Sequence, residues 1–147
     1  MRLTLYTDFS LRVLIHLALH RERLCSIREI SNSYAISHNH LTKVVKGLVD
    51  DGFIETIRGR SGGLRLARAP DKITVGQVVR RTEEGLQLAD CPDCVLSQAC
   101  GLTGVLAKGV EAMLAVFDGY TVEDLLTDKV VLRRLTKQQS PLGFSVT

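Results

Sequence analysis

The chain has 147 residues, 45% of them hydrophobic, and a formal net charge of +3 at pH 7. This length supports one domain with a hydrophobic core, or a small domain with an association arm, and leaves little room for two independent globules. No apolar run is long enough to cross a bilayer and no signal-peptide core follows Met1, so we expect a cytoplasmic protein with reduced thiols.

Positive charge is concentrated in the N-terminal half of the chain. Residues 1–70 contain eleven Lys and Arg against six Asp and Glu, whereas residues 71–147 contain eight against ten. This distribution is expected if the N-terminal half contacts a polyanion such as DNA, because phosphate contacts supply much of the affinity. A generally basic surface would give the same distribution, so charge alone does not decide.

Three helices are predicted near the N-terminus from capping residues and apolar spacing. Thr7 is the predicted N-cap of a first helix that ends near His20. Ser26 is predicted to cap a short second helix, and Ser37 a third helix over residues 38–50. A short helix, a tight turn and a second helix form a helix-turn-helix pattern.

The outer face of the third helix carries side chains suited to DNA. Asn and Lys side chains read base edges in the major groove, and Lys also holds phosphates. The candidates are His38, Asn39, His40, Thr42, Lys43 and Lys46. An ordinary solvated helix face has a similar composition, and that alternative stays open for this segment taken alone.

A hairpin is predicted directly after the third helix. Gly52 ends the helix, and two short strands flank a glycine-rich turn over residues 58–63. Arg58, Arg60 and Ser61 on this turn are further candidates for DNA contact. No Gly-Lys-Ser/Thr follows the glycines, which excludes a phosphate-binding loop. We therefore predict a mainly α fold with a small β-hairpin wing, a winged helix-turn-helix domain over residues 1–80.

Three of the four cysteines lie on a predicted loop over residues 81–101. Cys91, Cys94 and Cys100 fall within ten residues, so their thiolates could reach one metal centre. A tetrahedral zinc site needs a fourth strong ligand, and no histidine follows the cysteines. The spacing leaves three alternatives: an iron–sulfur cluster, a zinc ion, or a reversible disulfide or idle thiols.

A long apolar helix is predicted from Gln98 to Asp118. It has few predicted partners within the chain, so we expect it to pack against its symmetry mate in a homodimer, with burial inside the monomer as the alternative. Residues 102–130 are thus predicted to hold a dimerisation helix and a short C-terminal helix, which a capping box at Thr121 starts. Residues 131–147 are predicted to be a flexible tail.

An enzyme is not expected. Outside the cysteine loop the sequence lacks a Ser-His-Asp, Cys-His or paired-carboxylate set. Cys25 lies next to Ser26 without an evident base and is predicted to be a small core residue.

With these parts in place, the chain resembles the Rrf2 family of winged-helix regulators across nearly its whole length. The matching stretches are residues 1–4, Thr7-Asp8, Leu11-Arg12, residues 39–41, residues 58–66, the three cysteines and residues 120–125. The resemblance implies a homodimer on a palindromic operator. It also implies an iron–sulfur cluster held by Cys91, Cys94 and Cys100, with 4Fe-4S favoured over 2Fe-2S.

Within the family, the chain is most similar to the branch that senses nitric oxide, and an iron-responsive branch is the alternative. In the nitric-oxide branch the position of Asp8 supplies a fourth ligand to the cluster of the opposite subunit. Arg12 would then orient the Asp8 carboxylate. Asp8 could instead favour the first turn of its helix, with Arg12 as an ordinary i,i+4 partner. The hypothesis is a cluster-gated transcriptional repressor, with a zinc-dependent or thiol-redox DNA-binding regulator as the other alternative.

Overall fold

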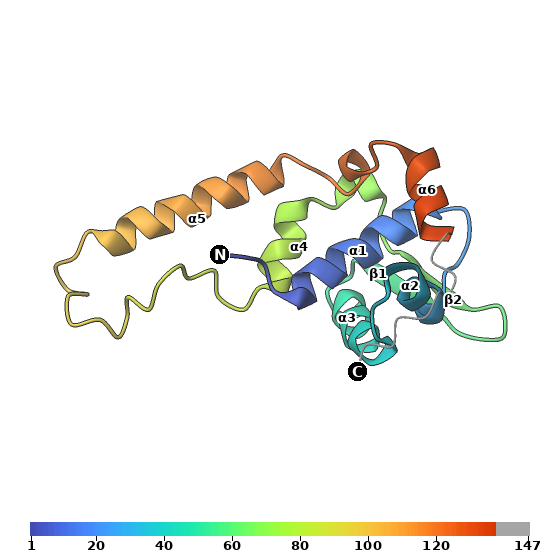
Figure 1. The fold of residues 1–147 in the computed structure, drawn as a ribbon, viewed down its shortest axis with the longest axis horizontal. Coiled ribbons are helices and arrows are strands. Elements are labelled where there is room, and N and C mark those ends of the chain that lie inside the picture. The colour runs from blue at the N-terminus through green and yellow to red at the C-terminus, as the bar shows by residue number, and fades with distance from the viewer. Residues whose placement is uncertain (138–147) are drawn as a thin grey trace.

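The computed structural model describes residues 1–137. The helices are α1 (Leu5–Leu19), α2 (Ile27–Tyr34), α3 (His38–Asp50), α4 (Val75–Thr82), α5 (Leu102–Asp118) and α6 (Lys129–Lys137). A hairpin of β1 (Ile54–Ile57) and β2 (Gly63–Leu66) follows α3, and two 3-10 helices are η1 (Pro70–Lys72) and η2 (Glu123–Leu125). The predicted class, mainly α with a hairpin wing, is confirmed. Figure 1 shows α5 projecting from a body built of the other helices, with the cysteine loop at its far end.

The core of the body is built around α1. Eight residues of this helix are buried, among them Val13, Leu14 and Leu17. Apolar side chains from the neighbouring elements complete the core, including Ile30, Leu41, Val44, Leu48, Ile54, Ile73 and Val78. Helix α1 packs against α3, α4 and β2. A shift of α1 would therefore disturb its contacts with both α3 and α4.

Local capping chemistry sets the helix-turn-helix. The hydroxyls of Ser26 and Ser37 accept hydrogen bonds from the backbone N–H groups of Glu29 and His40, at 3.0 and 3.2 Å. Both predicted caps are therefore confirmed. Gly52, at φ +74°, takes the left-handed conformation that turns the chain from α3 into β1.

The predicted cap of α1 is wrong by one helical turn. The helix begins at Leu5, and the N-cap is Thr4, whose hydroxyl accepts from the Thr7 N–H at 3.3 Å. Thr7 is fully buried, and its hydroxyl donates to Thr82 Oγ1 at 2.8 Å instead. Both threonines have capping chemistry, and the contact with α4 decides between them.

The hairpin is anchored to the connection between α1 and α2. In the antiparallel register Ile54 lies opposite Leu66, and Ile57 opposite Gly63. Cys25 extends the pairing, because its N–H donates to the Leu64 carbonyl at 3.0 Å and its own carbonyl accepts from the Leu64 N–H at 2.7 Å. The side chain of Cys25 is 1% exposed, as predicted for a core residue.

Helix α5 begins four residues later than predicted, at Leu102, because residues 98–100 belong to turns of the cysteine loop. At its other end, Asp118 accepts two hydrogen bonds from the Arg80 guanidinium of α4, at 2.5 and 2.7 Å. The chain then returns to the body, where the Val122 N–H donates to the Ile73 carbonyl at 2.8 Å.

The prediction of a flexible tail from residue 131 is wrong for residues 131–137, which belong to α6. Arg133 Nε donates to the Leu19 carbonyl at 3.0 Å, which ties α6 to the last residue of α1. The remaining part of that prediction, residues 138–147, lies outside the described residues. Within residues 1–137, the structure contains no helix with the length and apolar character needed to cross a bilayer.

Candidate functional site

The outer face of α3 carries the side chains that the sequence predicts to contact DNA. All six of its predicted DNA-contacting residues are exposed, whereas Leu41, Val44, Val45 and Leu48 on the opposite side are buried. Lys43 and Lys46 lie one turn apart on this face. The exposed cations and amide can therefore approach a groove without disturbing the core.

The wing tip adds a second basic element. Arg58, Arg60 and Ser61 are all exposed on the turn between β1 and β2. Gly59 has φ +112°, a conformation that side-chain-bearing residues rarely adopt. The tight turn thus depends on glycine and leaves both arginine side chains free of the body.

The cysteine loop, predicted over residues 81–101, begins after α4 at residue 83, and residues 83–101 contain neither α-helix nor strand. Its turns are closed by backbone hydrogen bonds, such as Cys94 N–H to the Cys91 carbonyl at 3.2 Å. The thiols of Cys91, Cys94 and Cys100 are free, and each is at least partly exposed. Among residues 1–137 these three do not form a group close enough to share one ion, so metal binding requires the loop to close further.

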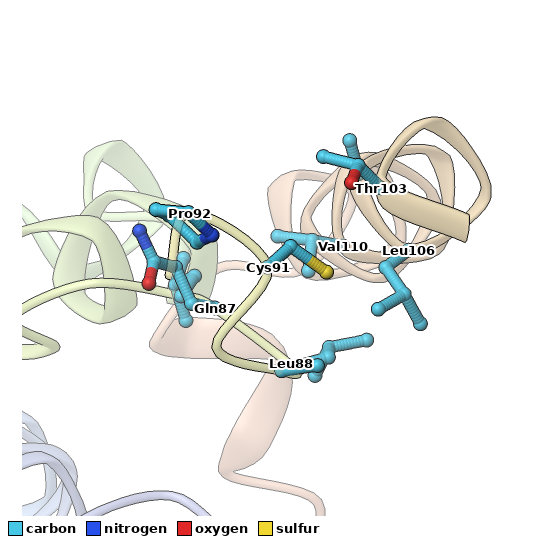
Figure 2. Close-up of a pocket in the computed structure, with 10 residues that line it drawn as sticks. Gln87, Leu88, Cys91, Pro92, Thr103, Leu106 and Val110 are labelled. Atoms are coloured by element: carbon cyan, nitrogen blue, oxygen red, sulfur yellow. The ribbon is translucent and has the colours of Figure 1, made fainter. Parts of the chain in front are cut away.

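Cys91 lines a hollow of about 160 Å³ between the loop and the start of α5. Figure 2 shows its sulfur directed toward Leu106 of the helix, and Val110 of α5 also lines the hollow. The lining is mainly apolar, with Leu86, Leu88, Pro92 and Ala107 also contributing. An apolar wall beside a thiol limits the access of water. If a metal were bound by this thiolate, the apolar surroundings would influence its reactivity.

Asp8 is paired with Arg12 on the surface of α1. The guanidinium donates to both carboxylate oxygens, with Nε to Oδ1 at 2.9 Å and Nη2 to Oδ2 at 2.8 Å. The predicted i,i+4 contact between these two residues is confirmed. The Asp8 side chain is 39% exposed, so a second subunit could still reach it.

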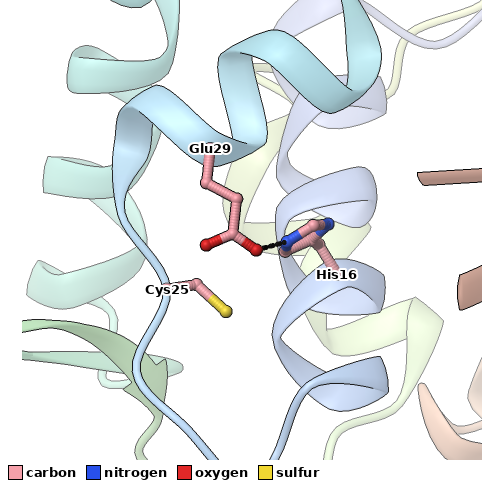
Figure 3. Close-up of side chains that lie close together, drawn as sticks. All are labelled: His16, Cys25 and Glu29. Atoms are coloured by element: carbon pink, nitrogen blue, oxygen red, sulfur yellow. Dashed lines mark hydrogen bonds and ion pairs between the residues drawn. The ribbon is translucent and has the colours of Figure 1, made fainter. Parts of the chain in front are cut away.

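A partly buried polar cluster that the sequence analysis missed links α1, the turn after it and α2. His16, Cys25 and Glu29 bring one ligand atom each within 4.8 Å of one another (Figure 3). Their chemistry could suit a divalent ion, but a cation is already present, since Arg23 donates to both Glu29 oxygens at 2.9 and 2.5 Å. The cluster is therefore explained as an internal ion pair.

The protonation states of this cluster follow from its contacts. Hydrogen bonds from Arg23 lower the pKa of Glu29 to about 2, and burial raises the pKa of the Cys25 thiol to about 11. Burial also lowers the pKa of His16. Its Nε2 lies 3.0 Å from Glu29 Oε1 and its buried Nδ1 has no partner within residues 1–137, which fits a neutral ring that donates through Nε2.

Comparison with known proteins identifies the family. The Rrf2 family, described as "Iron-dependent Transcriptional regulator", matches residues 3–128. The chain is 47% identical over 143 residues to the HTH-type transcriptional regulator NsrR of Halalkalibacterium halodurans, covering 93% of this chain and 98% of that protein. It is also 47% identical over 145 residues to NsrR of Bacillus subtilis, covering 95% of this chain and 99% of that one.

Solved structures agree with the fold. CymR, the global cysteine regulator of B. subtilis, superposes with a TM-score of 0.73 at 27% identity, covering 85% of this chain and 95% of that chain. IscR of T. potens superposes with a TM-score of 0.70 at 26% identity, covering 87% and 88%. The matched family consists of regulators rather than enzymes, and this chain belongs to the Rrf2 family of DNA-binding transcriptional regulators.

Proposed function

We propose that the chain is a transcriptional repressor that holds an iron–sulfur cluster through Cys91, Cys94 and Cys100 and senses nitric oxide with it. The observation that carries the proposal is three free thiols on one loop, one of which, Cys91, lines an apolar hollow. The similarity to NsrR proteins and the description of the family as iron-dependent support the choice of iron.

The donor set fits such a cluster better than a structural zinc site. Thiolates are the usual ligands of iron–sulfur clusters, and no histidine follows the loop to complete a strong tetrahedral zinc site. When bound, the cluster supplies iron atoms that react with nitric oxide. We propose a 4Fe-4S cluster rather than a 2Fe-2S cluster.

Asp8 of the partner subunit is proposed as the fourth ligand. A carboxylate is a hard donor and a weak partner for iron that thiolates already bind, so this position is the one most readily lost. Arg12 holds the carboxylate through two hydrogen bonds and would fix its orientation. The sensing site would then span two subunits.

Helix α5 is proposed as the dimerisation element. Only Leu114 of its 17 residues is buried within the chain. Leu102, Val105 and Val116 are 51%, 65% and 59% exposed, an unusual state for apolar residues of a long helix. A second copy of α5 would bury this face, in a two-fold symmetric contact.

The dimer is proposed to bind a palindromic operator. Two-fold symmetry would present two α3 helices to successive major grooves about 34 Å apart. His38, Asn39, His40 and Thr42 are assigned to base edges and backbone, and Lys43 and Lys46 to phosphates. Arg58, Arg60 and Ser61 of the wing would contact the flanking minor groove or backbone.

The test is a titration of nitric oxide into anaerobically purified protein bound to operator DNA. Operator affinity should fall in step with the bleaching of cluster absorption. Unchanged affinity as the cluster bleaches would remove the gating mechanism. Loss of affinity on iron chelation, but not on nitric oxide treatment, would favour an iron-responsive regulator, and a colourless, zinc-loaded anaerobic preparation would favour the zinc alternative.

The ligand assignment is tested separately. Iron and sulfide counts per dimer by native mass spectrometry distinguish the two cluster types. Asp8→Ala should keep the iron content but change the rate of reaction with nitric oxide. Identical spectra and kinetics in the variant would restrict Asp8 to a helix-stabilising role.

A further inference from the structure

We propose that Glu83 is a positioning residue that carries the state of the cysteine loop to the recognition helix through the first turn of α1. The inference rests on the proposed function, because it explains how a change at the cysteines reaches DNA. It adds a residue that is neither a proposed ligand nor a proposed DNA contact. Its basis is a chain of hydrogen bonds and packing contacts within one subunit.

Glu83 stands where the body of the protein ends and the cysteine loop begins. It is the C-cap of α4, and its N–H donates to the Val79 carbonyl at 2.9 Å. The loop that follows has no regular element until α5 starts at Leu102. Any force that closes the loop around a cluster therefore acts on the backbone at Glu83.

The side chain of Glu83 reaches across to the N-terminus of α1. Its Oε1 accepts from the Thr4 N–H at 2.8 Å and from the Thr4 hydroxyl at 2.9 Å. These are charge-assisted bonds to the N-cap residue, whose amide has no partner inside the helix. Figure 1 shows this start of α1 beside the end of α4.

A second contact lies directly beneath the first. The Thr7 hydroxyl donates to Thr82 Oγ1 at 2.8 Å, and Thr82 in turn donates to the Val78 carbonyl at 2.9 Å. Both threonines are buried. Two consecutive residues at the end of α4 thus hold the first turn of α1, so the two segments should move together.

The held turn is also the one that carries Asp8. The Asp8 N–H donates to the Thr4 carbonyl at 3.0 Å, so Glu83 is linked to Asp8 through a single residue. Hydrogen bonds in such a series polarise one another. If Asp8 binds the partner's cluster, the same turn receives signals from both subunits.

The opposite side of this turn packs on the recognition helix. A Cβ at Gly47 of α3 would lie 1.9 Å from the Tyr6 hydroxyl, which shows how closely Tyr6 covers that glycine. One turn further, the Phe9 ring lies 6.2 Å from the ring of His40, centroid to centroid. A displacement of the first turn of α1 must therefore shift α3 or break these contacts.

The experiment compares operator affinity of the full-length protein with the cluster intact and after nitric oxide treatment, in wild type and in Glu83→Ala. We expect the ratio of the two affinities to fall by about fivefold or more in the variant, within the range of typical coupling between sites. The cluster absorption should stay unchanged. Glu83→Gln keeps an acceptor for Thr4 and should recover most of the ratio.

Glu84→Ala is the matched control, since Glu84 is the next residue, is exposed and makes no side-chain hydrogen bond within residues 1–137. If Glu83→Ala does not fold, Glu83→Asp replaces it, because the shorter side chain withdraws the carboxylate from Thr4 and should lower the ratio in the same direction. An unchanged ratio, or equal loss of affinity in both states, would overturn the inference. A wild-type ratio near one would instead refute the proposed function itself.

Discussion

The Arg23–Glu29–His16 cluster makes a quantitative prediction about acid stability. The pKa of Glu29 falls from 4.5 to about 2 on folding. Without screening, that shift would correspond to about 3.4 kcal/mol. The side chains of Glu29 and Arg23 are 29% and 44% exposed, so solvent screening reduces the contribution to about 1–2 kcal/mol. Glu29→Gln should therefore lower the free energy of unfolding by this amount at pH 7.

The sign of the pH dependence follows from a depressed acidic pKa. Glu29 stabilises the folded state fully above its unfolded pKa, near 4.5, and this contribution is lost as the pH falls toward 2. The difference between wild type and Glu29→Gln should therefore be constant from pH 7 to about 5.5 and shrink below pH 4.5. Urea unfolding of wild type and Glu29→Gln, both prepared without an iron–sulfur cluster, measures this stability difference at several pH values.

Glu55→Gln is the matched control for this prediction. Glu55 also pairs with an arginine, Arg65, at 2.5 Å, but the two side chains are 45% and 54% exposed on the hairpin. A surface pair of this kind contributes about 0–1 kcal/mol. Equal destabilisation by the two substitutions, or a difference at Glu29 that does not change with pH, would refute the assignment of Glu29 as a partly buried partner that is ionised at neutral pH.

Three further predictions concern the DNA face, the dimer helix and the contact between α1 and α3. Lys43→Ala should weaken operator binding and lower the slope of log affinity against log salt by about one, as measured by anisotropy at several salt concentrations. Val105→Asp should give a monomer by light scattering, because it places a charge on the apolar face of α5; a stable dimer would move the interface elsewhere. Gly47→Ala gains about 0.5–1 kcal/mol of helix propensity but displaces the Tyr6 hydroxyl, so stability should stay near wild type while operator affinity falls.

Where a structure is determined by local chemistry, the sequence was sufficient to predict it. Ser26 and Ser37 cap their helices as expected, because each supplies a hydroxyl three residues before an amide that needs an acceptor. The hairpin follows from two alternating strands around glycines, and its register from burial of one face. The winged helix-turn-helix was predictable for this reason.

Where contacts between segments far apart in the chain determine the structure, the sequence was not sufficient to predict it. Thr4 and Thr7 are equally good caps in isolation, and only contacts with Glu83 and Thr82, more than seventy residues away, assign their roles. Helix α6 was missed because its pattern is short, and its contact with the Leu19 carbonyl is not visible in the sequence. The exposed side of α5 and the open arrangement of the thiols have a related origin. We propose that a second copy of α5 covers the helix and that a cluster, with Asp8 of the partner subunit, joins the thiols, and a single subunit contains neither.

The burial of α1 determines how a signal at its first turn would spread. A helix held only by its own hydrogen bonds could fray at Thr4 and absorb a displacement locally. Here Thr7 and Ser10 are fully buried within the first two turns, and Val13 and Leu14 follow at 0% exposure. Fraying would expose this buried surface and leave the Thr82 hydroxyl without its donor, so shifting the helix as a unit costs less. A closely packed helix between the cysteine loop and α3 therefore favours transmission over local unfolding.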